Sequence, residues 1–448
     1  MATDTLPPVA KDHYVADFER LADEGRWQGP KWLAEKRTSA ITQFSDIGFP
    51  STRAERWRFT NFSKLAGKTF AIGNGSTPLP SNLEELPDSV GWWGESRVVF
   101  LNGRYSPELS RVPELPSGVF AGRLASAVHE NTLLIEENLA QIEWPTENPF
   151  AALNTAFHAD GVVLFVPDGV AVEEPIQLLH LTTEENAEVV THARNLIILG
   201  DGAEATVVES YFGLGEADYW TNAATEINLG RGALLDSCRI QLEGSKAYHT
   251  AATRTRQGRD SRLCFTGVEL GSLLSRHDIQ AGLEGVGAEC ALYGLSHLQD
   301  RQHADQHTTI DHAKPHCSSR ESFNGVFDGR SHGVFTGRIL VRPGAQQTDA
   351  MQASRNLLLS KTAQVDTQPQ LEIFADDVKC THGATVGPID DEAMFYVQSK
   401  GLTPDEARAL LTYGFGKEIL KSITVDSLRE RMDVLFRSRL ERAWRNGG

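Results

Sequence analysis

The sequence predicts a mainly β protein built around a long coil of short strands, a β-solenoid. The coil is expected over residues 151–387, between a mostly helical N-terminal domain (residues 1–150) and a helical C-terminal domain (residues 388–448). From residue 160 to about residue 373, short apolar segments follow one another, and turn glycines recur among them at a nearly constant interval. No long helical insertion separates these segments, which argues against a doubly wound α/β fold.

The short segments are rich in β-branched residues or alternate in polarity, as strands do. They are separated by turn glycines, and Gly200, Gly230, Gly258 and Gly285 follow one another at intervals of 30, 28 and 27 residues. A sandwich would also use short strands, but a regular period in the high twenties favours a solenoid. The exposed ends of such a coil need caps or partners. Examples of the strands are VVLFV (162–166), IQLLH (176–180), LIIL (196–199), ATVV (205–208) and RILV (338–341).

The N-terminal 60 residues are predicted to be helical, because Val15, Phe18 and Leu21 recur at helical spacing. The segment that follows, TRAERWRFTNFSKL (52–65), carries Arg, Trp and Phe side chains. We interpret it as an anchor that docks the helices on the rest of the chain, and an interaction surface is the alternative. Residues 66–95 are rich in Gly, Pro, Ser and Asn and are predicted to be loop.

Residues 96–150 are predicted to combine a strand at 97–101 with helical pieces, which completes the first domain near Pro149. Composition limits the class of protein further. A net charge of −17 argues against nucleic acid as the main partner, and no run of 18 or more apolar residues suggests a membrane span. The first residues lack a secretory signal pattern, and the five cysteines lie far apart without a C-x-x-C pair, so we expect a reduced, cytoplasmic protein.

The C-terminal domain begins after Gly387. Thr403 and Glu406 form a predicted capping box, with Pro404 at the first helical position. This helix is expected to stop at Gly414, and a short second helix is expected over residues 417–422. A third helix starts near Asp426 and carries its apolar residues on one side. We interpret that side as packed on its own domain, and a docking face for another protein is the alternative.

The candidate functional residues are Cys380 and His382, in a strand-like stretch that reads LEIFADDVKCTHGATVG (371–387). Residues two apart in a strand share a face about 7 Å apart, so the thiol and the imidazole would lie side by side, while Lys379 and Thr381 face the other way. Thiolate and neutral imidazole are ligands for iron, copper and zinc. A buried thiol beside a hydrogen-bonded histidine is the alternative.

A second group of histidines precedes this stretch. In an extended chain their imidazoles need not converge, so we interpret them as structural, and a metal or redox role stays the alternative. The group comprises His303, His307, His312, His316 and, beside them, Cys317.

Several long motifs resemble the SufB/SufD family of iron–sulfur cluster assembly subunits. The matching stretches begin ALNTAFHADGVV (152–181), GVFTGRILVRPG (333–360) and PQLEIFADDVKCTHGATVG (369–402), and TRAERWRFT is similar to a motif near the family's N-terminus. The C-x-H-G-A-T-V-G segment resembles the SufD branch of the family. Thr381 stands where the family often has serine, which should disturb neither neighbour.

The resemblance implies a right-handed parallel β-helix and a non-catalytic scaffold subunit that pairs with a SufB subunit along the edges of the two β-helices. It implies a transient iron–sulfur cluster at that interface, with His382 as a metal ligand and Cys380 as a second ligand. The isolated chain is expected to hold no cofactor and to be able to form a homodimer. A SufC ATPase is expected to dock on the C-terminal helices, near Thr403, Pro404, Leu410, Phe415 and Leu420.

Two enzyme classes are the alternatives. Cys380 would be a nucleophile with His382 as its base, but residues two apart on one strand seldom place a base within hydrogen-bond reach of a thiol. A β-helix enzyme acting on polysaccharides would use paired carboxylates at Asp376 and Asp377 or at residues 390–392. Adjacent carboxylates in a strand face opposite ways. The chain also lacks a G-x-x-x-x-G-K-[ST] phosphate loop, so any ATPase activity belongs to a partner.

Overall fold

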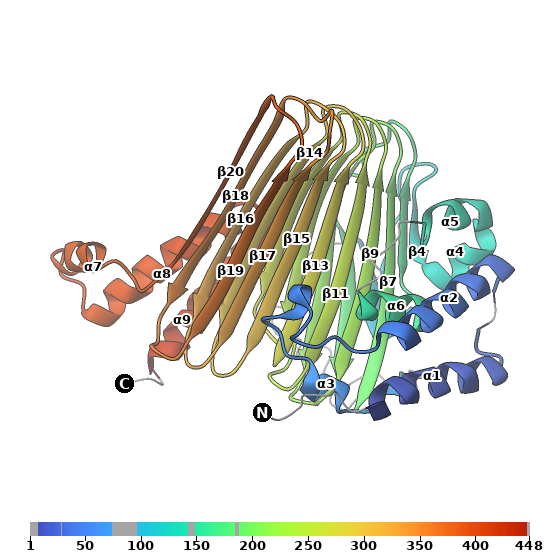
Figure 1. Ribbon diagram of the computed structural model, residues 1–448, viewed down its shortest axis with the longest axis horizontal. Helices are drawn as coiled ribbons and strands as arrows, with labels where there is room; N and C mark the ends of the chain where they lie inside the picture. The colour runs from blue at the N-terminus through green and yellow to red at the C-terminus, as the bar shows by residue number, and fades with distance from the viewer. Residues whose placement is uncertain (1–7, 28, 74–95, 142–147, 184–187, 446–448) are drawn as a thin grey trace.

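Figure 1 shows the computed structural model of the chain, which describes residues 8–27, 29–73, 96–141, 148–183 and 188–445. A stack of long parallel strands forms the body of the molecule, and helices lie at both ends and over parts of its faces. Within the described residues, the strands form two sheets of ten, and successive strands of the coil alternate between them. The β-solenoid prediction is confirmed.

We name the two sheets by their last strands, and each list below follows the chain. Sheet 1, which ends at β19, contains β4 (Phe120–Arg123), β5 (Val162–Val166), β7 (Val189–Leu199), β9 (Trp220–Leu229), β11 (Tyr248–Gln257), β13 (Leu274–Leu283), β15 (His303–His312), β17 (His332–Val341) and β19 (Gln364–Ile373), and β1 (Ala71–Ile72) pairs with β7. Sheet 2, which ends at β20, contains β2 (Ser96–Leu101), β3 (Arg104–Tyr105), β6 (Ile176–Thr183), β8 (Glu204–Leu214), β10 (Leu234–Leu242), β12 (Arg262–Glu269), β14 (Glu289–Leu298), β16 (Ser318–Phe327), β18 (Thr348–Leu358) and β20 (Val378–Gly387).

The turn glycines explain the period of the coil. Along sheet 1, from β5 to β19, each strand is parallel to the strand one coil earlier, as at Trp220, Tyr248 and Leu274, which are successive register partners. At the turns the coils touch backbone to backbone, because a Cβ on Gly285 would lie 2.0 Å from the Arg259 backbone nitrogen. A larger residue would therefore separate two coils at this turn.

The space between the two sheets, which we call the lumen, has an apolar half and a polar half. Leu235, Leu263 and Cys290, which are successive register partners near the start of the sheet 2 strands, represent the apolar half. Because side chains alternate between faces, the positions two, four and six residues further along sheet 2 also face the lumen. Those positions carry buried polar side chains, among them Glu209, Tyr211, Arg239, Gln241, Glu269, Glu321 and Gln352.

The buried charges of the lumen are paired with one another. The His249 Nδ1 and Glu243 Oε2 atoms lie 2.6 Å apart, and Arg239 donates to Glu269. The Tyr211 hydroxyl donates to Glu209 over 2.5 Å. Buried charges are tolerated only when they are paired and hydrogen-bonded, so these bonds allow a polar lumen.

The N-terminal helices cover the outer face of sheet 1. Trp57 and Phe62, in the segment 52–65, are buried against Trp220 and other aromatic residues, and the Arg276 guanidinium lies 3.9 Å from the Trp57 ring centroid. The docking interpretation of this segment is confirmed. Much of the predicted loop at 66–95 lies outside the described residues. The helices are α1 (Pro8–Asp23), α2 (Lys31–Ile47), the 3-10 turn η1 (Glu55–Trp57), α3 (Ser63–Ala66), α4 (Leu124–Glu130), α5 (Thr132–Asn138) and α6 (Pro149–Phe157).

The C-terminal helices are α7 (Asp391–Gln398), α8 (Pro404–Leu420) and α9 (Asp426–Arg445). The capping box is confirmed, since the Thr403 hydroxyl accepts from the Glu406 backbone N–H and the Glu406 side chain accepts in return. The predicted stop at Gly414 is wrong, and residues 417–420 of the predicted separate helix are the last turn of α8. A helix tolerates an interior glycine at a modest cost, which the burial of Ile419 offsets here.

Helices α8 and α9 pack on the outer face of sheet 2, so the apolar side of the third predicted helix is packed within the chain, but on the solenoid rather than only on its own domain. Leu428, Met432 and Phe436 of α9 are buried in one cluster with apolar residues of sheet 2. Helix α7, by contrast, projects away from the solenoid at the left of Figure 1. Among the described residues, no helix combines the length and the apolar character needed to cross a membrane. The division of the chain at residues 150 and 387 into three domains stays a prediction.

Candidate functional site at the end of the solenoid

The coil ends in two strands whose outer edges are unpaired within the described part of the chain. β19 bonds only to β17 and β20 only to β18, so each is the terminal strand of its sheet. A terminal strand presents a row of backbone donors and acceptors that can pair with another chain. β20 is the strand that carries Cys380 and His382.

Cys380 lies at the inner side of this edge. Its register partner Ala350 is buried, and Cys380 packs against the apolar cluster that contains Ala350, Ile339 and Val341. Burial raises the pKa of the Cys380 thiol, so the thiol is protonated at neutral pH in the absence of a metal. A bound metal ion would displace that proton, because the thiolate is the form that ligates.

His382 lies two residues further along the same strand, and its side chain is exposed. Its register partner is Gln352, which is buried in the lumen like Ala350. Cys380 and His382 are therefore paired in register with Ala350 and Gln352, two residues of β18 whose side chains both face the lumen. Within the described residues, no group of three or more His, Cys, Asp or Glu side chains is arranged to hold a metal ion. The edge itself thus supplies two donors.

Sequence reasoning missed the residues beneath His382. Gln352 Nε2 donates to Glu321 Oε2 over 2.5 Å, and Glu321 is the register partner of Gln352 on β16. Burial raises the pKa of Glu321 to about 7. The period of the coil could have revealed Glu321 and Gln352, because Glu321, Gln352 and His382 are spaced by 31 and 30 residues, close to one coil each.

The histidine group of residues 303–316 does not converge. His303 and His307 lie on one face of β15, where His303 contacts Thr60 and the His332 ring, and His307 contacts Arg276. His312 bonds to Ser319, whereas His316 sits in a turn with a φ of 62°. The Cys317 thiol donates to the Gly285 carbonyl over 3.2 Å. Each side chain has its own local surroundings, which fits the structural interpretation.

The five predicted docking residues differ in what they offer. Thr403 and Pro404 form the start of α8, and Leu410 on the same helix is 50% exposed. Phe415 is partly buried against the sheet 2 cluster. Leu420 is 1% exposed, so its side chain anchors α8 on the solenoid and offers no surface to another molecule.

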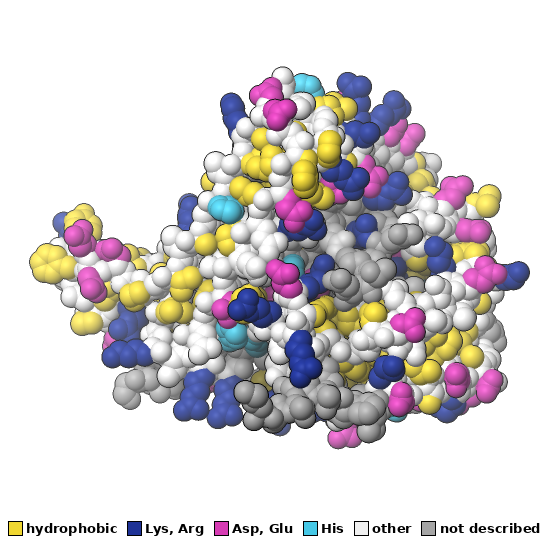
Figure 2. Space-filling model, viewed as in Figure 1, with side chains coloured by type: hydrophobic (Ala, Val, Ile, Leu, Met, Phe, Trp, Pro, Cys, Tyr) yellow, Lys and Arg dark blue, Asp and Glu magenta, His cyan; other side chains and the backbone are white. Residues whose placement is uncertain are grey.

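Sequence reasoning also missed two aromatic side chains on the projecting helix α7. Phe395 is 74% exposed and Tyr396 is 63% exposed. Figure 2 shows hydrophobic side chains gathered on this projecting part of the molecule. The adjacent Phe–Tyr pair was the sequence signal for this surface, and it does not reveal exposure.

Neither enzyme alternative gains support from the geometry. No hydrogen bond joins Cys380 to His382 in the described structure, and the raised pKa of the thiol opposes its use as a nucleophile. Asp376 and Asp377 are exposed in the turn before β20. Asp390 caps α7 by accepting the Ala393 backbone N–H over 2.7 Å.

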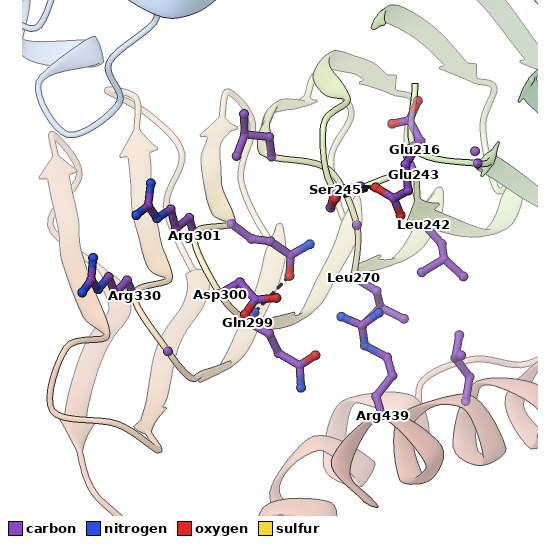
Figure 3. Close-up of a pocket in the computed structure, with 18 residues that line it drawn as sticks. Glu216, Leu242, Glu243, Ser245, Leu270, Gln299, Asp300, Arg301, Arg330 and Arg439 are labelled. Atoms are coloured by element: carbon purple, nitrogen blue, oxygen red, sulfur yellow. Dashed lines mark hydrogen bonds between the residues drawn. The ribbon is translucent and has the colours of Figure 1, made fainter. Parts of the chain in front are cut away.

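A large cavity lies elsewhere, between the turns of sheet 2 and helix α9 (Figure 3). Its volume is about 1060 Å³, and Arg439 reaches it from α9. The lining combines Arg301 and Arg330 with the acidic Glu216 and Asp300. Both signs of charge are present, so this cavity favours no single class of ligand.

The fold and the edge together define a class of protein: a β-solenoid between helical segments that offers a thiol and an imidazole on an unpaired terminal strand. Comparison with known proteins supplies the family. Residues 180–415 match the family described as SUF system FeS cluster assembly, SufBD core domain, and residues 9–178 match the SufBD protein N-terminal region. The chain belongs to the SufBD family of iron–sulfur cluster assembly proteins.

Similar proteins carry the same family name. The chain is 33% identical over 412 residues to an iron–sulfur cluster assembly SufBD family protein of Synechocystis, covering 89% of each chain. It is 30% identical to the iron–sulfur cluster assembly protein SufD of Escherichia coli, over 89% of this chain and 91% of that one. It is 26% identical to SufD of Bacillus subtilis, over 90% of this chain and 93% of that one.

Proposed function

We propose that this chain is a SufD-type scaffold subunit that pairs with a SufB-type subunit and binds a nascent iron–sulfur cluster at the shared interface. The observation that carries the proposal is the pair Cys380 and His382 on a terminal strand with an unpaired edge. A second solenoid that paired with this edge would bring its own side chains to the same place. The chain would act in the cytoplasm, without catalytic activity of its own.

The chemistry of the two donors suits a transient cluster. Thiolate and imidazole both ligate iron in iron–sulfur centres. Two donors from this chain, completed by donors from a partner, give a site that opens when the two subunits move apart. We propose His382 as the principal ligand, because its side chain is exposed at the edge, and Cys380 as the second.

The motion would come from an ATPase subunit of the SufC type that docks on α7 and α8. The exposed Leu410, Phe395 and Tyr396 support this part of the proposal, because clustered apolar side chains on a projecting element mark protein interfaces. Thr403 and Pro404 fix the start of α8 beside that surface, and Phe415 and Leu420 hold the helix on the solenoid.

The proposal is tested by anaerobic reconstitution of the complex with SufB-type and SufC-type subunits, comparing the wild type with His382→Ala. We expect the variant to assemble but to hold at least about tenfold less iron and sulfide, because a cluster ligand is lost. Visible absorption, iron content and sulfide content are the readouts. His129→Ala, which removes an exposed histidine from α4, is the matched control and should leave all three unchanged.

Two results would count against the proposal. If His382→Ala holds as much iron and sulfide as the wild type, His382 is not a ligand and the cluster site lies in the partner. If the pure chain turns over a glycan or a thioester, the chain is an enzyme rather than a scaffold.

A further inference from the structure

A column of three side chains runs across the end of sheet 2 toward the proposed cluster site. Glu321 on β16, Gln352 on β18 and His382 on β20 are successive register partners. Neighbouring strands lie about 4.8 Å apart, so side chains that share a face and a register position are within contact reach of one another. Gln352 is therefore the side chain of β18 that lies next to His382.

The amide group of Gln352 is held in one place. The side chain is 1% exposed, and its Nε2 donates to Glu321 Oε2 over 2.5 Å. On the other sheet, Gly337 leaves the room that the amide occupies, since a Cβ there would lie 2.2 Å from Gln352 Nε2. When Glu321 is ionised, its carboxylate can only accept, so the end of the amide that faces it is the NH2 group.

The other end of this amide has no partner within the described structure. Gln352 Oε1 is buried, and no group donates a hydrogen bond to it. Because Nε2 is bonded to Glu321 on β16, Oε1, the other arm of the planar amide, is not directed at that carboxyl group. A buried carbonyl oxygen without a donor destabilises the fold, so a ligand or side chain that supplies a donor would be favoured beside it.

His382 is the neighbour that carries such a donor. A neutral imidazole offers one N–H and one lone pair. A histidine that ligates a metal through one nitrogen almost always donates its other N–H to a carbonyl or carboxylate oxygen, which fixes the ring. Within the described structure no hydrogen bond holds the His382 ring, so the ring is free to turn toward Gln352.

We propose that Gln352 is a positioning residue, which accepts the ring N–H of His382 and so fixes the nitrogen that the ring offers to iron. This inference rests on the proposed function, because it assumes that His382 is a ligand. Glu321 orients the amide from behind, and Gly337 keeps the space for it. In this way a buried carboxyl group in the lumen would help to orient a histidine ring at the edge of the solenoid.

The test uses the reconstituted complex with Co²⁺ as a spectroscopic probe of the proposed site. Gln352→Met keeps the length of the side chain and removes the acceptor, and we expect it to weaken Co²⁺ binding about 10- to 100-fold. Gln352→Glu keeps an acceptor oxygen, and we expect it to retain most of the affinity. In the His382→Ala background, Gln352→Met should cause no further loss.

A second glutamine in the same sheet provides the control. Gln177 on β6 is also buried and lies near the opposite end of sheet 2, so Gln177→Met should leave Co²⁺ binding unchanged. If Gln352→Met fails to assemble, Gly337→Ala displaces the amide without removing it and should weaken binding in the same way.

The outcomes separate this inference from the function on which it rests. If His382→Ala weakens Co²⁺ binding but Gln352→Met binds like the wild type, the positioning role is refuted and the ligand role stands. If His382→Ala itself binds Co²⁺ like the wild type, the proposed ligand role fails. If Gln352→Met and Gln352→Glu weaken binding equally, the acceptor oxygen is irrelevant and the inference is overturned.

Discussion

The carboxyl group of Glu321 lies deep in the lumen, and burial raises its pKa to about 7 from an ordinary value of 4.5. The folded chain therefore keeps a proton that the unfolded chain releases above pH 4.5. The stability that this protonated group contributes is fully present below pH 4.5 and is lost as the pH rises toward 7. A pKa difference of this size corresponds to about 3 kcal/mol.

The first prediction concerns this residue. Glu321→Gln replaces the carboxyl group with a neutral amide that can still accept from Gln352. We expect the variant to equal the wild type in free energy of unfolding near pH 4.5, and to exceed it by up to about 3 kcal/mol at pH 7 and above. Urea unfolding at several pH values measures the difference, with the exposed Glu137→Gln as control. A difference that does not change with pH would contradict the raised pKa.

Single residues also show what the sequence can predict about the candidate site. Cys380 and His382 are two positions apart, so strand geometry alone indicated that they share a face. Gln352 and Glu321 lie 30 and 61 residues before His382. Their proximity depends on the register of three coils, and the spacing between register partners ranges from 27 to 31 residues along sheet 2 from β6 to β20. Local patterns therefore found the two donors and missed the residues beneath them.

At the scale of elements, helix α8 shows how tertiary packing overrides a local stop signal. Gly414 follows an otherwise complete helix, yet the helix continues for six more residues to Leu420. The last turns place Ile419 and Leu420 in the cluster beneath α8 and α9. Burial of each such side chain is worth about 1.5–3 kcal/mol, which exceeds the cost of one glycine in a helix, about 1 kcal/mol.

The second prediction uses two glycines of this helix. A Cβ on Gly414 meets nothing within 4 Å, so Gly414→Ala should stabilise the chain by about 1 kcal/mol. A Cβ on Gly416 would lie 2.4 Å from the Phe436 ring, so Gly416→Ala should destabilise it by about 1–3 kcal/mol. Denaturant unfolding of both variants gives the comparison. Equal effects of the same sign would show that helix propensity alone governs this segment.

At the scale of the whole molecule, the two ends of the solenoid differ. At the N-terminal end, each sheet finishes with an antiparallel pair, β4 with β5 and β3 with β2. At the C-terminal end, β19 and β20 leave their outer edges open, with Phe374 and Val386 exposed beside them. The open edge is thus the surface on which another solenoid can continue both sheets.

The third prediction tests this edge. Val386 is 43% exposed on β20, and Val386→Lys places a charge on the surface that would meet the SufB-type partner. We expect association with the partner to weaken at least about tenfold, while thermal stability of the isolated chain changes little. Leu133→Lys on α5, at the other end of the molecule, is the control for an added charge. Equal association of both variants would place the interface elsewhere.

At this scale the sequence predicted the solenoid but not the placement of the terminal helices or the polar half of the lumen. The period of the glycines indicated a solenoid. The period arises because adjacent coils touch at their turns, and the contact at Gly285 allows no larger residue. Which sheet the terminal helices cover could not be predicted, since helices α8 and α9 and the segment at 52–65 each offer an apolar side without indicating its target. The polar half of the lumen was equally hidden, because its members lie on different coils.

The stacked coils also have a consequence for the order in which the molecule opens. In a solenoid each coil is stabilised mainly by contacts with the coils on either side of it. The stability of the whole is therefore close to a sum of contributions from single coils and from pairs of adjacent coils. The last coil, which contains β19 and β20, has only one neighbouring coil, so we expect it to open more readily than the coils inside the stack. The proposed ligands lie on this coil. A partner that paired with β19 and β20 would supply the missing neighbour, and the same contact would stabilise the last coil and order the proposed ligands.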